Sequence, residues 1–267
     1  MDWQLSTAEA ATLEFLEQSP STNTALVALA ASDEPPVDFS VILTTNQTAG
    51  RGRLGRVWVA PPGKTIAVSV LLRPVLPAGE PLELAHFGWL PLIAGVAMST
   101  AVASVVPPHR VGLKWPNDVQ IDGLKVSGIL AELVPSGDAV VIGAGLNVSI
   151  AADELPTTTS TSLALAGADV GDNNADAVLA LYLKTLRSLY TGFVRLGADP
   201  EGSGILDLVT ESCTTLGQQV RVHLPGGDDL YGTATGIDQS GRLLVRRQTD
   251  GHVTAVAAGD VTHLRYE

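Results

Sequence analysis

The first third of the chain alternates between helical and extended hydrophobic patterns. The pattern predicts helices over residues 6–18 and 21–31 and buried strands over residues 39–45 and 65–73. Ser6 and Glu9 have capping-box spacing, which favours a helix start at Ser6. Between the two strands lies a loop that is dense in glycine and arginine.

An uncharged stretch follows, from residue 84 to residue 108. It is long enough to suggest a membrane span, but its apolar residues are mostly Ala and Val, and Pro91, Ser99 and Ser104 interrupt it. The composition therefore predicts a buried core helix over residues 84–105, and no membrane partner is expected.

The remaining pattern is mixed and then becomes purely extended. Short strands are expected over residues 111–115, 119–121, 125–134 and 139–148, with an Asp122-Gly123 hairpin turn among them. Cap residues 172–174 open an amphipathic helix that Gly197 ends. Runs at 220–224, 232–237, 243–246 and 253–257 then predict a small all-β barrel. We place the domain boundary between residues 210 and 211, giving domains 1–210 and 211–267.

Composition narrows the classes of function. The chain has 28 acidic and 16 basic residues, for a net charge of −12, and one cysteine, Cys213. Binding to DNA, RNA or an anionic membrane is not expected, because phosphate binding needs concentrated Lys and Arg. One cysteine and five scattered histidines offer no metal-ligand spacing, so a metal site is left unknown. The acidic N-terminus lacks the features of a signal peptide, which predicts a cytoplasmic protein.

The local charge departs from this acidic average. No acid lies between Asp38 and Glu80, whereas five basic residues do: Arg51, Arg53, Arg56, Lys64 and Arg73. Three of them alternate with Gly50, Gly52 and Gly55, which free the backbone to approach a ligand. The arginines can donate paired hydrogen bonds to phosphate or carboxylate. A solvated flexible loop is the alternative interpretation.

The glycine spacing Gly50-x-Gly52-x-x-Gly55 also fits a dinucleotide-binding fingerprint. That fingerprint requires a helix directly after the glycines and an acid about 20 residues further on. Here the next residues are Val57-Trp58-Val59-Ala60-Pro61-Pro62, and no acid lies between residues 56 and 79. The Rossmann interpretation is therefore rejected.

Two further motifs carry polar groups at strand ends. Lys114-Trp115-Pro116-Asn117-Asp118 leaves Asn117 and Asp118 as orienting or metal-facing groups, and Lys125 follows on the next strand. An ordinary ion pair between Lys114 and Asp118 is the alternative. In Gly143-Ala144-Gly145-Leu146-Asn147, the glycines admit something close to the backbone and Asn147 can read a polar group.

Taken together, these motifs resemble the biotin protein ligase family in its short form without an N-terminal DNA-binding domain. The resemblance covers residues 17–267. It rests on Ser21-Thr22-Asn23, on Gln47 with the loop Gly50 to Trp58, on residues 114–118, on Lys125 with Gly128-Ile129-Leu130, and on residues 143–147. It implies an α+β fold, with a mixed-sheet catalytic domain of the biotin/lipoate ligase type and an SH3-like C-terminal domain.

The resemblance implies an ATP-dependent enzyme that acts in two steps. Biotin and ATP, with Mg²⁺, give biotinyl-5′-AMP, and biotin then passes to a lysine on a carboxyl carrier domain of an acyl-CoA or pyruvate carboxylase. Catalytic roles are implied for Arg51, Arg53, Lys125 and Asp118, the last serving either the amine or a metal. The implied biotin site is Ser21, Thr22, Asn23, Gln47, Arg51, Gly52, Arg53 and Lys125. The implied nucleotide site is Arg51, Arg53, Trp58, Lys114, Asn117 and Asn147.

Three alternatives remain open. A lipoate or octanoate ligase shares the catalytic fold, although the arginine loop and residues 114–118 favour biotin. An octanoyl transferase of the same fold uses a cysteine nucleophile, and Cys213 lies far along the chain from every motif. A non-enzymatic biotin-sensing repressor needs about 60 residues of helix-turn-helix before Ser21, and twenty precede it here. Specific DNA binding is therefore not expected.

Overall fold

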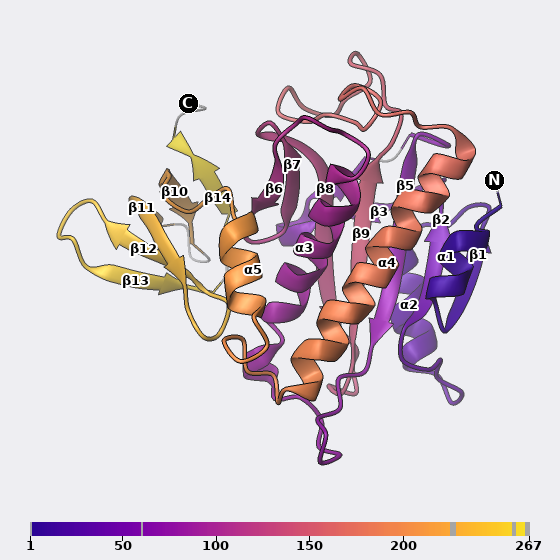
Figure 1. Ribbon diagram of the computed structural model, residues 1–267, viewed down its shortest axis with the longest axis horizontal. Coiled ribbons are helices and arrows are strands. Elements are labelled where there is room, and N and C mark those ends of the chain that lie inside the picture. Colours follow the sequence, from indigo (N-terminus) through magenta and orange to yellow (C-terminus); the bar gives the residue numbers. More distant parts are fainter. Residues whose placement is uncertain (1, 60, 225–227, 258–259, 265–267) are drawn as a thin grey trace.

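The computed structural model describes residues 2–59, 61–224, 228–257 and 260–264. Its larger part is built on a seven-stranded sheet, which Figure 1 shows with helices packed against it. In spatial order the strands are β1 (Thr12–Leu16), β2 (Ser40–Thr44), β5 (Thr65–Leu72), β9 (Val140–Asn147), β8 (Leu124–Leu133), β7 (Asp118–Ile121) and β6 (Val111–Lys114). The β1–β2 pair is parallel and all other neighbours are antiparallel, which confirms the predicted mixed sheet.

The N-terminal prediction of one helix over residues 6–18 is wrong. The chain forms a short helix, α1 (Gln4–Glu9), and then the edge strand β1. Ser6 does not cap a helix, because it lies inside α1, where its hydroxyl donates to Asp176 Oδ1 at 2.6 Å. Pairing of Thr12–Leu16 with β2 satisfies the backbone that a longer helix would have used. A long-range pairing thus overrides a local capping pattern.

The next elements follow the predicted pattern closely. Helix α2 (Thr22–Ala30) begins after Ser21, whose hydroxyl accepts from the Thr24 amide as an N-cap does. Strands β2 and β5 are buried along their whole length, as expected of continuous apolar runs. The Asp122-Gly123 pair takes positive φ at both residues and joins β7 to β8, which confirms the predicted hairpin.

The uncharged stretch forms a short 3₁₀ turn (Leu84–His86) followed by helix α3 (Trp89–Ala103). Pro91 lies in the first turn of α3, where a missing N–H does no harm. Residues 84–103 are long and apolar enough to cross a membrane, but 67% of the most apolar window is buried inside the protein. The prediction of a core helix is confirmed by this burial.

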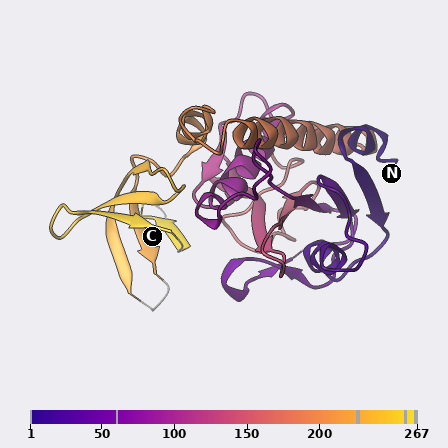
Figure 2. The ribbon, with the colours of Figure 1, turned by 90° about the horizontal axis from the view of Figure 1, so that it is seen from below.

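Helix α4 (Asp172–Arg195) is the long amphipathic helix, and Gly197 follows it with φ of +72°. Its N-cap residue is Gly171, one residue before the predicted cap residues 172–174. Helices α1, α3 and α4 pack together over one face of the sheet. Helix α2 lies on the other face, together with a hairpin of β3 (Gly50–Arg51) and β4 (Val57–Trp58) (Figure 2).

Strand alternation divides the sheet between these two faces. On β9, Val140, Ile142, Ala144 and Leu146 join the large core under α3 and α4. The intervening positions face α2 and the hairpin, and two of them are Gly143 and Gly145. This face therefore has a floor of backbone with few side chains of its own, which leaves space there.

The C-terminal part is an antiparallel sheet in the order β13 (Val253–Val256), β12 (Leu243–Arg247), β11 (Asp229–Ile237), β10 (Gln219–His223) and β14 (Asp260–His263). These strands confirm that the C-terminal part is small and all-β. Their pairing forms one open order, so the closed barrel stays a prediction. A helix that the pattern did not predict, α5 (Ile205–Ser212), precedes them and packs on α3 and β6. The predicted boundary at 210/211 falls within α5, and it stays a prediction.

Candidate active site

A pocket opens on the sheet face that carries α2 and the β3–β4 hairpin. The hairpin, the start of α2, and strands β5, β8 and β9 all contribute to its walls. The structure brings together most residues that the sequence singled out: Ser21, Thr22, Asn23, Gln47, Arg51, Gly52, Arg53, Trp58, Asn117, Asp118 and Lys125 all line the pocket. The charged side chains in its lining are four cations, Arg51, Arg53, Arg56 and Lys125, against one carboxylate, Asp118. In a protein of net charge −12, this pocket is therefore suited to an anionic ligand.

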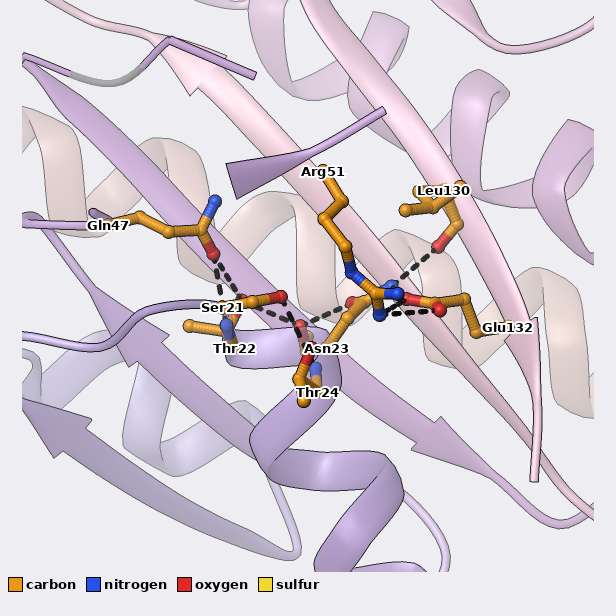
Figure 3. Close-up of polar contacts among 9 residues, drawn as sticks. Ser21, Thr22, Asn23, Thr24, Gln47, Arg51, Leu130 and Glu132 are labelled. Atoms are coloured by element: carbon orange, nitrogen blue, oxygen red, sulfur yellow. Dashed lines mark hydrogen bonds and ion pairs between the residues drawn. The ribbon is translucent and has the colours of Figure 1, made fainter. Parts of the chain in front are cut away.

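One end of the pocket is neutral and is organised by hydrogen bonds around the start of α2 (Figure 3). The Thr22 amide donates to Gln47 Oε1 at 3.0 Å, and the Thr22 hydroxyl also lies within 3.3 Å of that oxygen. Ser69, on β5, places its hydroxyl 2.8 Å from Thr22 Oγ1 and 2.6 Å from Asn23 Oδ1. The four side chains thus hold one another in place before any ligand binds.

Asn23 depends on a glycine in the neighbouring strand. A β-carbon at Gly143 would lie 2.1 Å from Asn23 Oδ1, so the absence of a side chain there makes room for the amide. The Asn23 Nδ2 group donates to the Leu130 carbonyl at 3.1 Å and to Glu132 Oε2 at 2.8 Å. Asn23 is 5% exposed, so its position is fixed by the fold.

Glu132 also binds the first arginine of the loop. Arg51 Nη2 lies 2.6 Å and 2.8 Å from the two carboxylate oxygens of Glu132 (Figure 3). The sequence analysis missed Glu132 and Ser69, because each looked like an ordinary strand position. Because side chains alternate along a strand, residues 130 and 132 share a face with Gly128, and this alternation would have placed them toward the pocket.

The second arginine is held by the end of the 114–118 motif. Arg53 Nη1 donates to Asn117 Oδ1 at 3.1 Å. Asn117 is itself fixed to β8, because its Nδ2 group donates to the Ile129 carbonyl and its own carbonyl accepts from the Ile129 amide. Through Asn117, the 114–118 motif thus connects the arginine loop to strand β8 by hydrogen bonds.

Lys125 reaches the pocket because strand β8 is irregular. The pairing of β7 with β8 shifts between Val119 and Gln120, which turns Lys125 and Gly128 to the same face. The Lys125 ammonium lies 2.6 Å from Asp118 Oδ1. The alternative interpretation was an ordinary ion pair between Asp118 and Lys114, whereas the structure pairs Asp118 with Lys125.

Gly128, Gly143 and Gly145 form one surface of the pocket, which we call the glycine floor, and Trp58 covers part of it. A β-carbon at Gly145 would lie 2.3 Å from the Trp58 ring, and one at Gly128 would lie 3.2 Å from it. The Lys125 ammonium lies 5.6 Å from the centre of the same ring, within cation–π range. Trp58 Nε1 is buried without a hydrogen-bond partner among the described residues, and it lies against Gly145, where an added β-carbon would be 2.7 Å from it.

Two predicted residues lie outside the lining. Lys114 is at the end of β6, and Asn147 ends β9 with 3% exposure. Asn147 Nδ2 donates to the Thr161 carbonyl at 2.9 Å, which ties β9 to the following loop. The structure does not bring these two side chains into the pocket, and their roles in nucleotide binding stay predictions.

The described residues contain no group of three or more His, Cys, Asp or Glu side chains able to hold a metal ion. Asp118 and Glu132 are the carboxylates close to the pocket residues, and each is ion-paired with a cation. A Mg²⁺ ion in this pocket would therefore take most of its ligands from phosphate and water, as Mg²⁺ commonly does in nucleotide sites.

Comparisons with known proteins identify the family. A model of the Biotin/lipoate A/B protein ligase family matches residues 15–148, and one of the biotin protein ligase C-terminal domain matches residues 215–264. The chain is 41% identical to the biotin–[acetyl-CoA-carboxylase] ligase of Mycobacterium tuberculosis over 95% of its length and 89% of the relative's. It is 30% identical to the bifunctional ligase/repressor BirA of Escherichia coli over 81% of this chain and 64% of that protein.

Solved structures give the same result. The biotin protein ligase of Aquifex aeolicus, in complex with biotin and ATP, superposes with a TM-score of 0.73 at 26% identity. That match covers 94% of this chain and 98% of the other. The agreement extends over both sheets, because the matched length includes the C-terminal part. The chain belongs to the biotin protein ligase family.

Proposed function

We propose that this ligase joins biotin to a protein in two steps. In the first, a biotin carboxylate oxygen attacks the α-phosphorus of ATP, the bond to the β-phosphate oxygen breaks, and pyrophosphate leaves. In the second, a neutral lysine amine of the acceptor attacks the carbonyl carbon of biotinyl-5′-AMP, and AMP leaves. The Aquifex aeolicus relative binds biotin and ATP, and a Leishmania major relative binds biotinyl-5-AMP, in line with this sequence.

One observation carries the proposal: a neutral hydrogen-bonding end and a cationic end share one pocket. Biotin has the same division, with an uncharged ureido ring at one end and a carboxylate at the other. Thr22, Asn23 and Gln47 supply the hydroxyl and amide groups that an uncharged ring needs. Arg51, Arg53 and Lys125 supply positive charge for the carboxylate and the α-phosphate. Ser21 and Gly52 complete the proposed biotin site.

The cations make the first step possible because two anions must meet. Arg51 and Arg53 offset the repulsion between carboxylate and phosphate and hold them in line. Lys125 stabilises the negative charge that develops on the oxygens around the α-phosphorus, and later on the carbonyl oxygen. Asp118, 2.6 Å from Lys125, orients that ammonium in the described structure.

The second step needs a place for the acceptor amine, and Asp118 is the carboxylate in the pocket lining. We assign Asp118 to orient the amine or, together with phosphate oxygens, to hold Mg²⁺. When bound, Mg²⁺ supplies charge neutralisation on the phosphates. On the nucleotide side, Trp58 covers the adenine, with Lys114, Asn117 and Asn147 as further contacts.

The wider assignments follow from the same function. The acceptor is a carboxyl carrier domain of a biotin-dependent carboxylase, a class that the name of the Mycobacterium tuberculosis relative implies. This chain is proposed to act in the cytoplasm, as expected from its sequence. Residues 1–210 are proposed as the catalytic domain and residues 211–267 as the SH3-like domain.

A direct assay tests the function. The protein is incubated with ATP, Mg²⁺, labelled biotin and a carrier domain, and labelled carrier is the expected product. A carrier whose target lysine is changed to arginine is the control and should stay unlabelled. Biotin-dependent exchange of pyrophosphate into ATP tests the first step alone. Absence of both activities would refute the proposal, and biotin binding without either would favour a sensor.

The related acyl ligases are tested in the same assay. Lipoate or octanoate replaces biotin, and a transfer rate that exceeds the rate with biotin would change the substrate class. A cysteine mechanism is disfavoured, because Cys213 is 7% exposed, burial raises the pKa of its thiol, and it does not line the pocket.

A further inference from the structure

Two tryptophans of the catalytic part donate hydrogen bonds to the C-terminal part. Trp89, at the start of α3, donates its indole N–H to the Gln239 carbonyl at 2.9 Å. Trp115 donates its indole N–H to the Gly241 carbonyl at 3.1 Å. Both acceptors lie in the turn between β11 and β12, which we call the docking turn (residues 238–242). Two buried indoles thus hold two carbonyls of one short turn.

The docking turn is shaped for close approach. Gly241 has φ of +76°, and a β-carbon on it would lie 3.1 Å from Leu92 Cδ1. A β-carbon on Gly88 would lie 2.9 Å from the Ser240 carbonyl oxygen. Asp238 closes the turn from within by accepting from the Ser240 and Arg242 amides. The turn is therefore closed by its own hydrogen bonds and fits closely against the first turn of α3.

Trp115 has a second bond to the same C-terminal part. Its backbone N–H donates to Thr215 Oγ1 at 3.0 Å, and His263 Nε2 on β14 lies 3.2 Å from that hydroxyl. Trp115 is 2% exposed and Thr215 is fully buried. Both N–H groups of Trp115 are therefore satisfied by residues of the C-terminal part and not by the sheet on which Trp115 lies.

The residues directly after Trp115 belong to the active site. Asn117 accepts from Arg53 at 3.1 Å, and Asp118 pairs with Lys125 at 2.6 Å. Only Pro116 separates Trp115, which the C-terminal part holds, from Asn117, which holds Arg53. The neutral end is built by α2, β5, Gln47 and strand β8, and among the described residues its hydrogen bonds do not reach the C-terminal part.

We infer that Trp115, Thr215 and Gly241 are positioning residues, through which the C-terminal sheet sets the cationic end of the pocket. The inference rests on the proposed function. When these contacts are lost, Asn117 and Asp118 shift, and Arg53 and Lys125 shift with them. The rate of adenylate formation then falls, because small displacements of charged groups from reacting atoms are costly. Biotin affinity stays near its original value, because the neutral end is built elsewhere.

The test compares four variants with wild type. Thr215→Val removes the hydroxyl at nearly constant volume, Thr215→Ser keeps it, Trp115→Phe removes the indole donor, and Gly241→Ala strains the docking turn. Gly251→Ala is the matched control: its φ is +71°, but no atom lies within 4 Å of the added carbon. It therefore carries similar backbone strain without touching the catalytic part.

The readouts are kcat for pyrophosphate exchange at saturating substrate, the dissociation constant of biotin alone, and hydrogen exchange of residues 114–118. We expect kcat to fall about tenfold or more in Thr215→Val, Trp115→Phe and Gly241→Ala. Biotin affinity should change less than twofold, Thr215→Ser should recover most of the rate, and the 114–118 amides should exchange faster in Thr215→Val. Gly251→Ala should resemble wild type in all three.

Specific outcomes would overturn the inference. Wild-type kcat in Trp115→Phe and Gly241→Ala would do so, as would an equal loss in Gly251→Ala or an equal loss of biotin affinity. If Thr215→Val does not fold, the Trp115 and Gly241 variants still decide. Absence of exchange activity in wild type would refute the proposed function instead, and hydrogen exchange at 114–118 would then test the mechanical link by itself.

Discussion

The two ends of the pocket differ in how their side chains are held. At the neutral end, Thr22, Asn23 and Ser69 are each at most 5% exposed and hydrogen-bond to one another. At the cationic end, the Arg51 side chain is 49% exposed and that of Lys125 is 31% exposed, and each is held by a carboxylate. The neutral end is therefore preorganised, whereas the cationic end can exchange a protein partner for a ligand.

This difference predicts a division of labour. A preorganised cradle binds without first ordering its side chains, so it contributes mainly to affinity. Cations that act on developing charge contribute mainly to rate. Glu132 belongs to both ends, because its carboxylate contacts Asn23 and Arg51. Variants at either end therefore test whether affinity and rate are divided between the two ends.

The largest effect is expected for Lys125→Ala. Loss of a charge that acts in the transition state should lower kcat for pyrophosphate exchange about 10²–10³-fold. Biotin affinity should fall much less than kcat, because the ring end of the pocket is untouched and Arg51 and Arg53 still face the carboxylate. Lys184→Ala, an exposed position on α4 over the opposite face of the sheet, is the matched control. Unchanged turnover with a wild-type circular dichroism spectrum would rule out the role of Lys125.

Arg53→Ala should have the next largest effect and should act on both quantities. A charge-assisted hydrogen bond is worth about 1.5–3 kcal/mol, so retention of biotinyl-5′-AMP should weaken roughly 10- to 150-fold. Exchange and carrier labelling should slow together. The measurement is adenylate dissociation by rapid filtration, with the exposed Arg195→Ala of α4 as control. Wild-type retention and rates would show that the loop does not hold the anion.

Glu132→Gln should mainly change affinity. The variant keeps an acceptor for Asn23 but loses the charge that holds Arg51, so biotin binding by calorimetry should weaken about tenfold. Glu14→Gln, an exposed glutamate on strand β1, is the matched control. If kcat falls while affinity stays constant, Glu132 belongs functionally to the cationic end alone.

The smallest expected effect is on the order of the loop itself. The β3–β4 hairpin has two residue pairs and an exposed tip at Leu54 (63% exposed), so unliganded it should exchange its amides readily. Biotinyl-5′-AMP supplies the missing anion and should raise protection across residues 48–58 about tenfold. Hydrogen exchange with and without the adenylate measures this. Equal protection in both states would refute loop closure but not the roles of Arg51 and Arg53.

The sequence predicted the pocket better than it predicted the N-terminus. The glycines, the arginines and the 114–118 motif can be recognised from residue type alone. Close approach to a ligand needs glycine, and binding of an anion needs a cationic side chain. The failed helix over residues 6–18 had a local capping pattern but lost to pairing between β1 and β2, which no local pattern encodes. Glu132 and Ser69 escaped notice because their importance comes from the face of the strand on which they lie.

The bulge in β8 shows why such positions are hard to assign. Simple alternation would have put Lys125 and Gly128 on opposite faces, and the shift in pairing puts them on the same one. A bulge depends on the partner strand, so the sequence of β8 alone does not reveal it. Helix α5 was missed for a related reason, since it is only eight residues long.

The glycine floor has a consequence for substrate range. Gly128, Gly143 and Gly145 already carry the smallest possible side chain, so no substitution there can deepen the pocket. Any added atom meets Asn23, Trp58 or Lys125 instead. A ligase redesigned for a bulkier biotin analogue must therefore gain its space from the walls, by trimming residues that stand over the floor. The glycine floor therefore fixes the depth of the pocket. The range of carboxylic acids that the ligase accepts depends on the residues of α2 and the hairpin.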